Sequence, residues 1–434
     1  MEALTFADLA GADRAPTAEE AAWLAELATE VAPSLVTARL GRSCAADEPG
    51  PIVSCDPTGV WRAGRYVGEL YRNGRVIEIR PRLGVEAIAH WASAAFNLRI
   101  APQSGDTTGS QALIAEFLAA IWRAELVSAA RHGLPGIRTH RAHISEVAKG
   151  RLDVGTTLRL RASGRPQIAS ISRPKNIDNP ITRSIVAADR VIDGLVGRRD
   201  WRGDRVEELM PRLRSASGPR PKLPSRRELA GVRYTPITLP YKRTAELSYQ
   251  IAKRRGLQSR ATDDTTGGLL IDVAELWELF LLHCARVAFG ASNVTHGTGM
   301  DAARPLLRSQ RHPESGLGRL YPDIVVGPVD RPVAIIDAKY KPLADPRGVD
   351  REDLYQLNAY LTAHTDTRSA VFGALAYVDF PGQVRSAYAE ARGPWRTECG
   401  HRVVFTRLPT TEEACVAALN SLVCAGRDES QSSG

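Results

Sequence analysis

The sequence predicts a multidomain α+β protein, and three observations support this prediction. The chain has 434 residues, which is too long for one ordinary hydrophobic core. Hydrophobic residues make up 43% and charged residues 24% of it, as in folded globular proteins. Segments with helical spacing and segments with strand-like alternation occur in every part of the chain. We expect an N-terminal α+β domain at 1–150, a middle strand and helix region with a basic loop at 151–260, and a C-terminal α/β core at 261–434.

Two helices are expected in the N-terminal domain. Residues 17–31 carry apolar residues at helical spacing, and Thr17 followed three residues later by Glu20 has the spacing of a capping box. Residues 111–128 (QALIAEFLAAIWRAELVS) form a second strong helical pattern.

A β-hairpin is expected between these helices. Residues 66–80 (YVGELYRNGRVIEIR) alternate between polar and apolar side chains. Asn73-Gly74 lies in the middle of the segment, and both residues tolerate the positive φ angles of a tight hairpin turn.

The middle region is less regular. Residues 150–164 are expected to form a strand, a turn and a second strand, and 177–196 a turn marked by proline and then a helix. Residues 198–227 hold ten Arg and Lys together with several Pro, Gly and Ser, so we expect a basic, loop-rich stretch. That stretch is either a solvated connector or a surface that follows the phosphates of a nucleic acid.

The C-terminal core has the element order α-β-β-α-β, which suggests a mixed sheet with a helix on each face. Asp272 is expected to cap the first helix, with Glu275 three residues further on. The tail RDESQSSG is expected to be disordered. The elements are expected at 272–289, in two strands within 321–341, at 353–364 and at 370–380.

Charge and cysteine content narrow the possible functions. The net charge of +8 and the pI of about 9.3 are compatible with a nucleic-acid partner without requiring one. The six cysteines form no CxxC and no zinc-type spacing, and Cys284 lies in an apolar helical run, so we expect a reducing, cytoplasmic location. The N-terminus is acidic and lacks an apolar signal core, and no run of about 18 apolar residues predicts a membrane span.

Several catalytic motifs are absent from the sequence. It contains no GxxxxGK[ST] phosphate loop, no HExxH and no GxSxG, so we do not expect the chain to hydrolyse nucleotides by itself. His140, His143 and Glu146 lie three residues apart and could share a helix face. They could bind a metal, although surface or capping histidines are the more common case.

The most informative stretch is 321-YPDIVVGPVDRPVAIIDAKYK-341. Alternation along a strand places Asp337 and Lys339 on one face, and Asp323 can approach that face if the two apolar runs are hairpin neighbours. Two carboxylates around one point bind a hard cation such as Mg²⁺, and a nearby lysine can orient or help deprotonate an attacking water. The stretch thus suggests a site for phosphodiester hydrolysis. Taken alone, the pattern is explained more simply by an ordinary ion pair of Asp337 and Lys339 at a strand end, with Asp323 capping a turn.

Residues on the neighbouring helices favour the catalytic interpretation. Gln356 and Tyr360 lie one turn apart on the helix that follows the strands. Glu278 is a charge within the apolar run LWELFLL, where it either contributes to the site or faces solvent. This combination matches the PD-(D/E)xK nuclease superfamily.

The chain resembles the McrC family, which supplies the nuclease subunit of McrBC-type modification-dependent (type IV) restriction systems. The match covers about 60–434 and is most specific in LLIDVAELWELFLL, YPDIVV, AIIDAKYKPL and DLYQLNAYL. Looser matches upstream are YVGELYRNGRVIEIRPRLG, EVAKGRLDVGTTL, IDNPITRSIVAADRVI and YKRTAELSYQIAKR. The sequence departs from the family at Thr182, where an asparagine is expected before Arg183, and residues 1–60 have no clear match.

The resemblance implies a set of site residues and partners. Asp323, Asp337 and Lys339 would form the catalytic core with Gln356 in support. Glu278 would join the two aspartates in binding Mg²⁺ or Mn²⁺. The substrate would be double-stranded DNA, and the partner an AAA+ GTPase or ATPase motor like McrB that docks on the N-terminal domain.

Three functions therefore remain open. The favoured one is a metal-dependent DNA endonuclease subunit of a restriction or phage-defence complex, which stimulates its AAA+ partner. The second is a stand-alone repair or processing nuclease. The third is an adaptor that activates a partner ATPase without cutting. The intact set of Asp323, Asp337 and Lys339 argues against the adaptor.

Overall fold

In the computed structural model the chain forms two compact units. The structure describes residues 3–29, 36–38, 50–96, 109–131, 133–138, 140–196, 200–258, 267–297, 303–312, 314–343, 349–364, 370–382 and 394–431. Unit 1 consists of Met1–Phe117 together with Thr262–Gly434, and unit 2 consists of Leu118–Ala261. This arrangement differs from the linear three-part division expected from the sequence, because the two ends of the chain share one unit.

The first sheet of unit 1 explains why the ends belong together. Its strand order is β1-β6-β5-β12-β2. The strand β12 comes from the C-terminal half of the chain and pairs antiparallel with β5 and parallel with β2. A cut near residue 260 would therefore remove a strand from the N-terminal sheet. The strands are β1 (Leu4–Ala7), β2 (Val36–Ala38), β5 (Tyr66–Arg72), β6 (Arg75–Arg80) and β12 (Gly267–Asp272).

The local signals in this part of the sequence are confirmed. Helix α1 (Ala18–Thr29) is preceded by the predicted capping box. The N–H of Thr17 donates to Glu20 at 2.8 Å, and the N–H of Glu20 donates to the Thr17 hydroxyl at 3.3 Å. The hairpin of β5 and β6 turns at Asn73 and Gly74, whose φ angles are +48° and +72°.

The second sheet of unit 1 is mixed, as the element order predicted. Its strand order is β13-β16-β17-β18-β20-β19, with antiparallel pairing from β13 to β17 and parallel pairing from β17 to β20. A separate hairpin, β14 (Arg304–Arg308) with β15 (Gly316–Leu320), lies in the chain between β13 and β16. The sheet strands are β13 (Val294–His296), β16 (Ile324–Val326), β17 (Ala334–Lys339), β18 (Phe372–Val378), β19 (Trp395–Arg396) and β20 (Arg402–Leu408).

Helices flank this sheet. Helix α9 (Val273–Phe289) starts at the predicted cap, where Asp272 accepts hydrogen bonds from the N–H groups of Ala274 and Glu275. Helix α10 (Arg351–His364) buries Leu357 and Leu361 in a cluster with residues of β17, β18 and β20. Helix α11 (Glu412–Gln431) packs on α9 and extends into the tail that was expected to be disordered, so that expectation is wrong up to residue 431.

Aromatic side chains join helix α2 (Gly84–Phe96), which follows the first sheet in the chain, to helix α9, which flanks the second sheet. Trp91 of α2 lies with its ring centroid 5.0 Å from Trp277 and 5.6 Å from Phe280 on α9. Its indole N–H also donates to the carbonyl of Thr410 at 2.8 Å. Cys284 is fully buried on the same helix, as expected for a core residue.

A buried polar contact links the two sheets of unit 1. Asp8, next to β1, is fully buried and accepts a hydrogen bond of 2.7 Å from the hydroxyl of Tyr340, the residue after β17. The backbone N–H of Arg82 donates to the other Asp8 oxygen, and the Arg82 guanidinium lies 4.1 Å from the ring centre of Phe380. The N-terminal strand thus fixes the end of β17.

Unit 2 is built on helices. Trp122 of α3 donates to the hydroxyl of Ser248 on α8 at 2.8 Å, and its ring packs 5.8 Å from that of Trp201. The basic stretch 198–227 is largely helical, which corrects the expectation of a loop. Its Arg202 and Arg214 pair with the fully buried Asp189, so part of the positive charge neutralises the interior of the unit. The helices are α3 (Gly109–Ala130), which begins in unit 1, α5 (Pro180–Val196), α6 (Gly203–Ser217), α7 (Arg226–Ala230) and α8 (Tyr241–Gln258).

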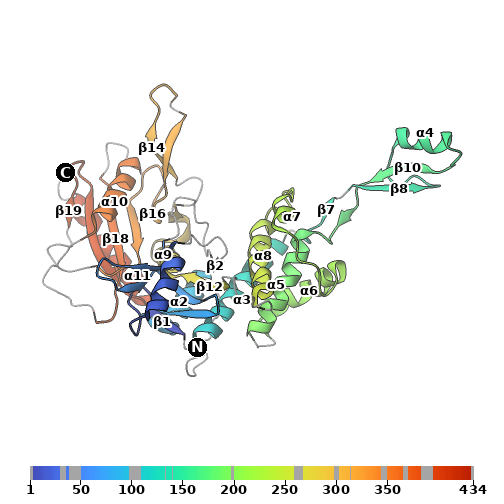
Figure 1. The fold of residues 1–434 in the computed structure, drawn as a ribbon. Coiled ribbons are helices and arrows are strands. Elements are labelled where there is room, and N and C mark those ends of the chain that lie inside the picture. Colours follow the sequence, from blue (N-terminus) through green and yellow to red (C-terminus); the bar gives the residue numbers. More distant parts are fainter. Residues whose placement is uncertain are drawn as a thin grey trace. The chain divides into compact units, whose positions relative to one another are not determined.

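A narrow arm of short strands extends from these helices (Figure 1). The expected strand at its far end is replaced by helix α4, because Asp153 caps it by accepting a 3.0 Å hydrogen bond from the N–H of Thr156. His143 lies on a strand and not on a helix, and its ring hydrogen-bonds to the hydroxyl of Ser172 at 2.8 Å. The helix face that could have carried a metal site of His140, His143 and Glu146 is therefore not formed. The arm consists of β7 (Ile137–Arg138), β8 (Arg141–Ser145), β9 (Arg151–Leu152), α4 (Val154–Ala162), β10 (Ile168–Ser172) and β11 (Lys175–Asn176).

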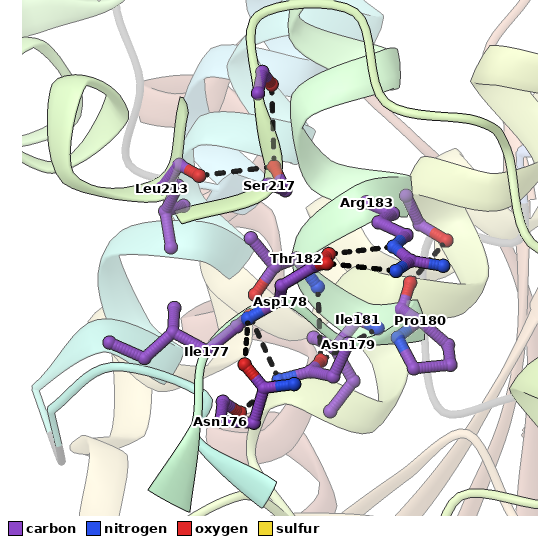
Figure 2. Close-up of polar contacts among 12 residues, drawn as sticks. Asn176, Ile177, Asp178, Asn179, Pro180, Ile181, Thr182, Arg183, Leu213 and Ser217 are labelled. Carbon is purple, nitrogen blue, oxygen red and sulfur yellow. Dashed lines mark hydrogen bonds and ion pairs between the residues drawn. The ribbon is translucent and has the colours of Figure 1, made fainter. Parts of the chain in front are cut away.

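The segment IDNPITRS closes the base of the arm (Figure 2). The Asn179 amide donates to the carbonyls of Pro135, on the chain entering the arm, and of Asn176, on the chain leaving it. Its oxygen accepts from the first N–H groups of α5. Arg183 forms a two-point ion pair with Asp178 at 2.6 and 2.9 Å. The Thr182 side chain is buried, so the departure from the family pattern lies in the interior.

Candidate active site

The candidate site lies at one end of β16 and β17. These strands are antiparallel neighbours with Ile324 opposite Ile336, so the register places Asp323 beside Asp337. Directly opposed residues of such a pair share one face of a sheet. The Oδ2 atom of Asp323 accepts a hydrogen bond of 2.7 Å from the backbone N–H of Ala338, which holds the two strand ends together.

Asp337 and Lys339 project from the same face of β17. The Asp337 side chain is only 1% exposed. The Lys339 ammonium lies 2.6 Å from its Oδ2 atom and balances part of its charge, whereas the Oδ1 atom has no hydrogen-bond partner among the described residues. Burying a carboxylate with unused lone pairs is costly unless a cation or donor is supplied. Asp337 is therefore suited to binding a ligand that carries positive charge.

Helix α10 positions the lysine. The Lys339 ammonium donates to Oε1 of Gln356 at 2.7 Å, and the Gln356 amide donates to the hydroxyl of Tyr360, one turn later, at 2.8 Å. The predicted pair of Gln356 and Tyr360 thus contacts the strand residues directly, and Lys339 is held by a carboxylate on one side and an amide on the other.

A further polar group, Asp353 with Lys341 and Tyr377, lies next to Lys339. Asp353 is buried on α10 and accepts a hydrogen bond of 2.9 Å from the hydroxyl of Tyr377. It also lies 2.9 Å from the ammonium of Lys341. Sequence reasoning missed these three residues. Lys341 could have been found, because it follows Lys339 at the two-residue spacing of a strand.

Glu278 reaches the site from α9 but is not free. Its Oε1 atom lies 2.6 Å from Nε2 of His296 on β13, and its side chain is 24% exposed. Glu278 therefore does not simply face solvent, which was one of the two expectations. Sequence reasoning missed His296, because its pairing with Glu278 depends on how β13 joins the sheet.

The electrostatics of the site are dominated by burial. Burial raises the pKa of Asp323 well above its usual value, and the negative charges of Glu278 and Asp337 raise it further. Burial also raises the pKa of Asp337, although the Lys339 charge opposes this. For Lys339, burial disfavours the charged form, but the surrounding carboxylates outweigh it and raise its pKa. Lys339 is thus an ammonium ion, suited to orienting a ligand and stabilising negative charge.

The site can accommodate a divalent cation only with the help of water. Among the described residues, no three His, Cys, Asp or Glu side chains are grouped so as to hold a metal by themselves. Mg²⁺ commonly uses one or two carboxylates and retains several waters. Asp323 and Asp337, with their crowded and partly unsatisfied oxygens, fit that requirement. Glu278 would have to leave His296 to join them.

One glycine is required by the shape of the site. A Cβ atom on Gly297, which follows β13, would overlap the carbonyl oxygen of Pro322. This close approach places the end of β13 directly against the backbone that leads into Asp323. It could not be foreseen from the sequence, since the two segments are 25 residues apart.

Comparison with known families decides the relationship. A family model described as a McrBC 5-methylcytosine restriction system component matches residues 61–377. The chain belongs to the McrBC family. The match covers most of the chain, including the strands with Asp323 and Asp337 and the helix with Gln356. No curated protein matched the sequence.

Two solved structures are similar to this chain, and the first of them supports the same fold. A half-complex from a tetradecameric assembly of Thermococcus gammatolerans McrB AAA+ hexamers with bound McrC matches at a TM-score of 0.50 and 15% identity. The match covers 97% of this chain and 100% of that one. The McrBC complex of the same organism matches at a TM-score of 0.37 and 15% identity, over 65% of this chain and 87% of that one. The family model confirms the resemblance to the McrBC family, and the half-complex shows a similar fold.

Within the described residues, no helix combines the length and apolar composition that crossing a membrane requires.

Proposed function

We propose that this McrBC-family chain is the metal-dependent endonuclease subunit of a restriction complex, in which it hydrolyses phosphodiester bonds of double-stranded DNA. The observation that carries the proposal is the convergence of Asp323, Asp337 and Lys339 at one strand end, with Gln356 holding the lysine. The buried Asp337 carboxylate pairs with Lys339 through Oδ2 and keeps Oδ1 available for a cation, which supports the proposal.

Each residue has a defined part in the proposed reaction. Asp323 and Asp337 would hold Mg²⁺ or Mn²⁺, and Glu278 would complete the set after release from His296. A bound divalent ion supplies Lewis-acid stabilisation of a phosphate oxygen and lowers the pKa of a coordinated water. Lys339, as an ammonium ion, would orient the attacking water or stabilise charge on the phosphate. Gln356 would keep the Lys339 side chain in place.

The partner would be an AAA+ motor that uses GTP or ATP. The sequence has no phosphate loop of its own, and the chain that it resembles comes from an assembly of McrB AAA+ hexamers with bound McrC. The expected docking region, 1–150, includes the first part of the arm. Five apolar side chains of the arm, two of them within 1–150 and three just beyond it, are 46% to 69% exposed, which is typical of a surface that contacts a protein. They are Ile144, Val147, Leu152, Val154 and Leu158.

The intact fold affects how docking is tested. Because β12 completes the N-terminal sheet, truncation near residue 260 would damage unit 1 and make a negative result meaningless. Substitutions in the full-length chain are therefore the appropriate test. We expect Val147→Ser with Leu158→Ser to reduce stimulation of the partner's nucleotide hydrolysis and to leave the nuclease site unchanged.

A cleavage assay separates the three candidate functions. The full-length chain is incubated with double-stranded DNA and Mg²⁺ or Mn²⁺, with and without the partner. Cutting that depends on the partner supports the restriction subunit. Efficient cutting by the chain alone would indicate a stand-alone nuclease, and partner stimulation without any cutting would indicate an adaptor.

A further inference from the structure

The hairpin of β14 and β15 lies between two strands that carry site residues. β13, which ends at His296, precedes it, and Asp323 follows the end of β15 by three residues. Three residues span at most about 11 Å of extended chain. The hairpin therefore starts and ends beside the candidate active site, and it projects beyond the second sheet (Figure 1).

The root of the hairpin is anchored to the scaffold of the site. Leu320 packs against a cluster that includes Ile335 of β17 and Leu357 of α10. The Arg304 guanidinium donates to the carbonyl of Val329 at 3.3 Å. Helix α10, which carries Gln356, contacts both strands of the hairpin. The hairpin is thus held by the same elements that position the catalytic candidates.

The outer part of the hairpin carries an exposed pair of leucines. Leu307 and Leu317 lie directly opposite each other and are 58% and 70% exposed. A cross-strand pair of leucines shares one face of the ribbon. Leaving such a pair in water is unfavourable, so these side chains suggest a surface that is covered during function.

The charge of the hairpin is positive. Between residues 303 and 320 the sequence contains four arginines against a single carboxylate, Glu314. Arg311 near the tip and Arg319 on β15 are both exposed. Arginines spread along a projecting element are suited to a backbone of phosphates, because each contact releases condensed counterions.

The dimensions also fit duplex DNA. Each strand of the hairpin has five residues, which corresponds to a length of about 17 Å at about 3.3 Å per residue. The major groove is about 12 Å wide and admits a two-stranded β-ribbon. A ribbon of this length that follows the helix axis covers about five base pairs, since each base pair rises about 3.4 Å along that axis.

We propose that the β14–β15 hairpin binds duplex DNA beside the scissile phosphodiester, with its arginines on backbone phosphates and the Leu307–Leu317 face toward the groove. The proposal rests on the proposed nuclease function. The hairpin lies beside the candidate active site, and this position favours DNA over a protein as the molecule that covers the hairpin. The hairpin then sets where the duplex lies relative to Asp323 and Asp337.

Binding can be measured without cutting. Full-length protein is titrated with a fluorescent 30-base-pair duplex in EDTA at several salt concentrations. We expect the double variant Arg311→Gln, Arg319→Gln to bind several-fold more weakly and to lower the slope of log K against log salt by about 1.8, or about 0.9 for each lost phosphate contact. Leu317→Ser should weaken binding with no change in slope.

The control variant is Arg286→Gln, Arg396→Gln, which removes the same charge from exposed positions on α9 and on the edge strand β19. It should bind with wild-type slope. Thermal melting of all variants checks folding, which these exposed positions should not disturb. If the arginine variant keeps the affinity and slope of the wild type, the hairpin does not bind DNA and the proposal is overturned.

Two further outcomes distinguish this proposal from the nuclease assignment. If the wild type never cuts DNA but the hairpin variants lose binding, the nuclease function fails and the hairpin assignment stands. If hairpin variants bind and cut normally but fail to stimulate the partner, the hairpin is a protein-contacting surface and the DNA proposal is wrong.

Discussion

Replacing Tyr340 by phenylalanine removes a single oxygen from the contact that joins the N-terminal strand to the strand of Asp337 and Lys339. The hydroxyl donates at 2.7 Å to Asp8, which is fully buried. The remaining contacts of that carboxylate are with Arg82, whose guanidinium nitrogen lies 3.7 Å away. A lost hydrogen bond to a charged, buried acceptor costs about 1.5–3 kcal/mol. We expect Tyr340→Phe to destabilise the protein by that amount at pH 8.

The loss of folding stability caused by Tyr340→Phe should depend on pH, and the protonation of Asp8 sets the direction. Burial raises the folded-state pKa of Asp8 above its usual value, although the hydrogen bond from Tyr340 works against this. A raised folded-state pKa means that stability falls as pH increases from the unfolded-state value, near 3.8, through the folded-state value. Removing the hydroxyl raises that pKa further, so the fall continues over a wider pH range. Tyr340→Phe should therefore cost less stability at acid pH, where Asp8 is protonated in the folded state, than at pH 8.

Urea denaturation of wild type and variant at a series of decreasing pH values, starting at pH 8, measures the difference. Tyr355→Phe is the matched control, because Tyr355 is 65% exposed on α10, and it should change stability by less than about 0.5 kcal/mol. Since Tyr340 follows Lys339, cleavage of saturating DNA should also slow in the Tyr340 variant. A Tyr340→Phe effect below about 0.5 kcal/mol at pH 8, or one that does not change across the pH series, would refute the reasoning.

Three further predictions concern the site and the arm. Asp337→Asn should reduce DNA cleavage at least about 100-fold while leaving stimulation of the AAA+ partner intact, and wild-type cleavage rates in this variant would remove Asp337 from the site. EDTA should stop cleavage and Mg²⁺ or Mn²⁺ should restore it, whereas Ca²⁺ should support little cutting; full activity in EDTA would contradict a metal role. Asn179→Ala should destabilise unit 2 by about 2 kcal/mol in urea, because a helix cap and two arm contacts are lost, while Asp178→Asn should cost less than about 1 kcal/mol; equal effects would contradict the assigned role of Asn179.

Local patterns in the sequence predicted most elements of unit 1. The capping box at Thr17, the turn at Asn73-Gly74 and the cap at Asp272 depend on residues within four positions, and all three are confirmed. The position of β12 in the N-terminal sheet could not be predicted, because pairing between segments about 200 residues apart leaves no local signal. The same holds for Asp8 with Tyr340.

The errors in unit 2 arose where two structures suit the same residues. The segment at 150–164 alternates like a strand, but Asp153 caps a helix instead, and propensity alone did not reveal this. The arginines at 198–227 suggested an exposed loop, because nothing local shows that Arg202 and Arg214 neutralise the buried Asp189. At the candidate site, the strand register brought Asp323 and Asp337 together as expected, whereas His296 depended on tertiary packing.

The place of β12 has a consequence for how the protein is made. Strand β5 ends at Arg72, and β12, which covers its edge, begins at Gly267. At about 5–20 residues per second, a ribosome needs roughly 10–40 s to synthesise the intervening chain. During that time the edge of β5 has no permanent neighbour, and an unpaired edge is a template for association with other chains. Folding of unit 1 must therefore wait for unit 2 to be synthesised, and nascent chains need protection over this interval.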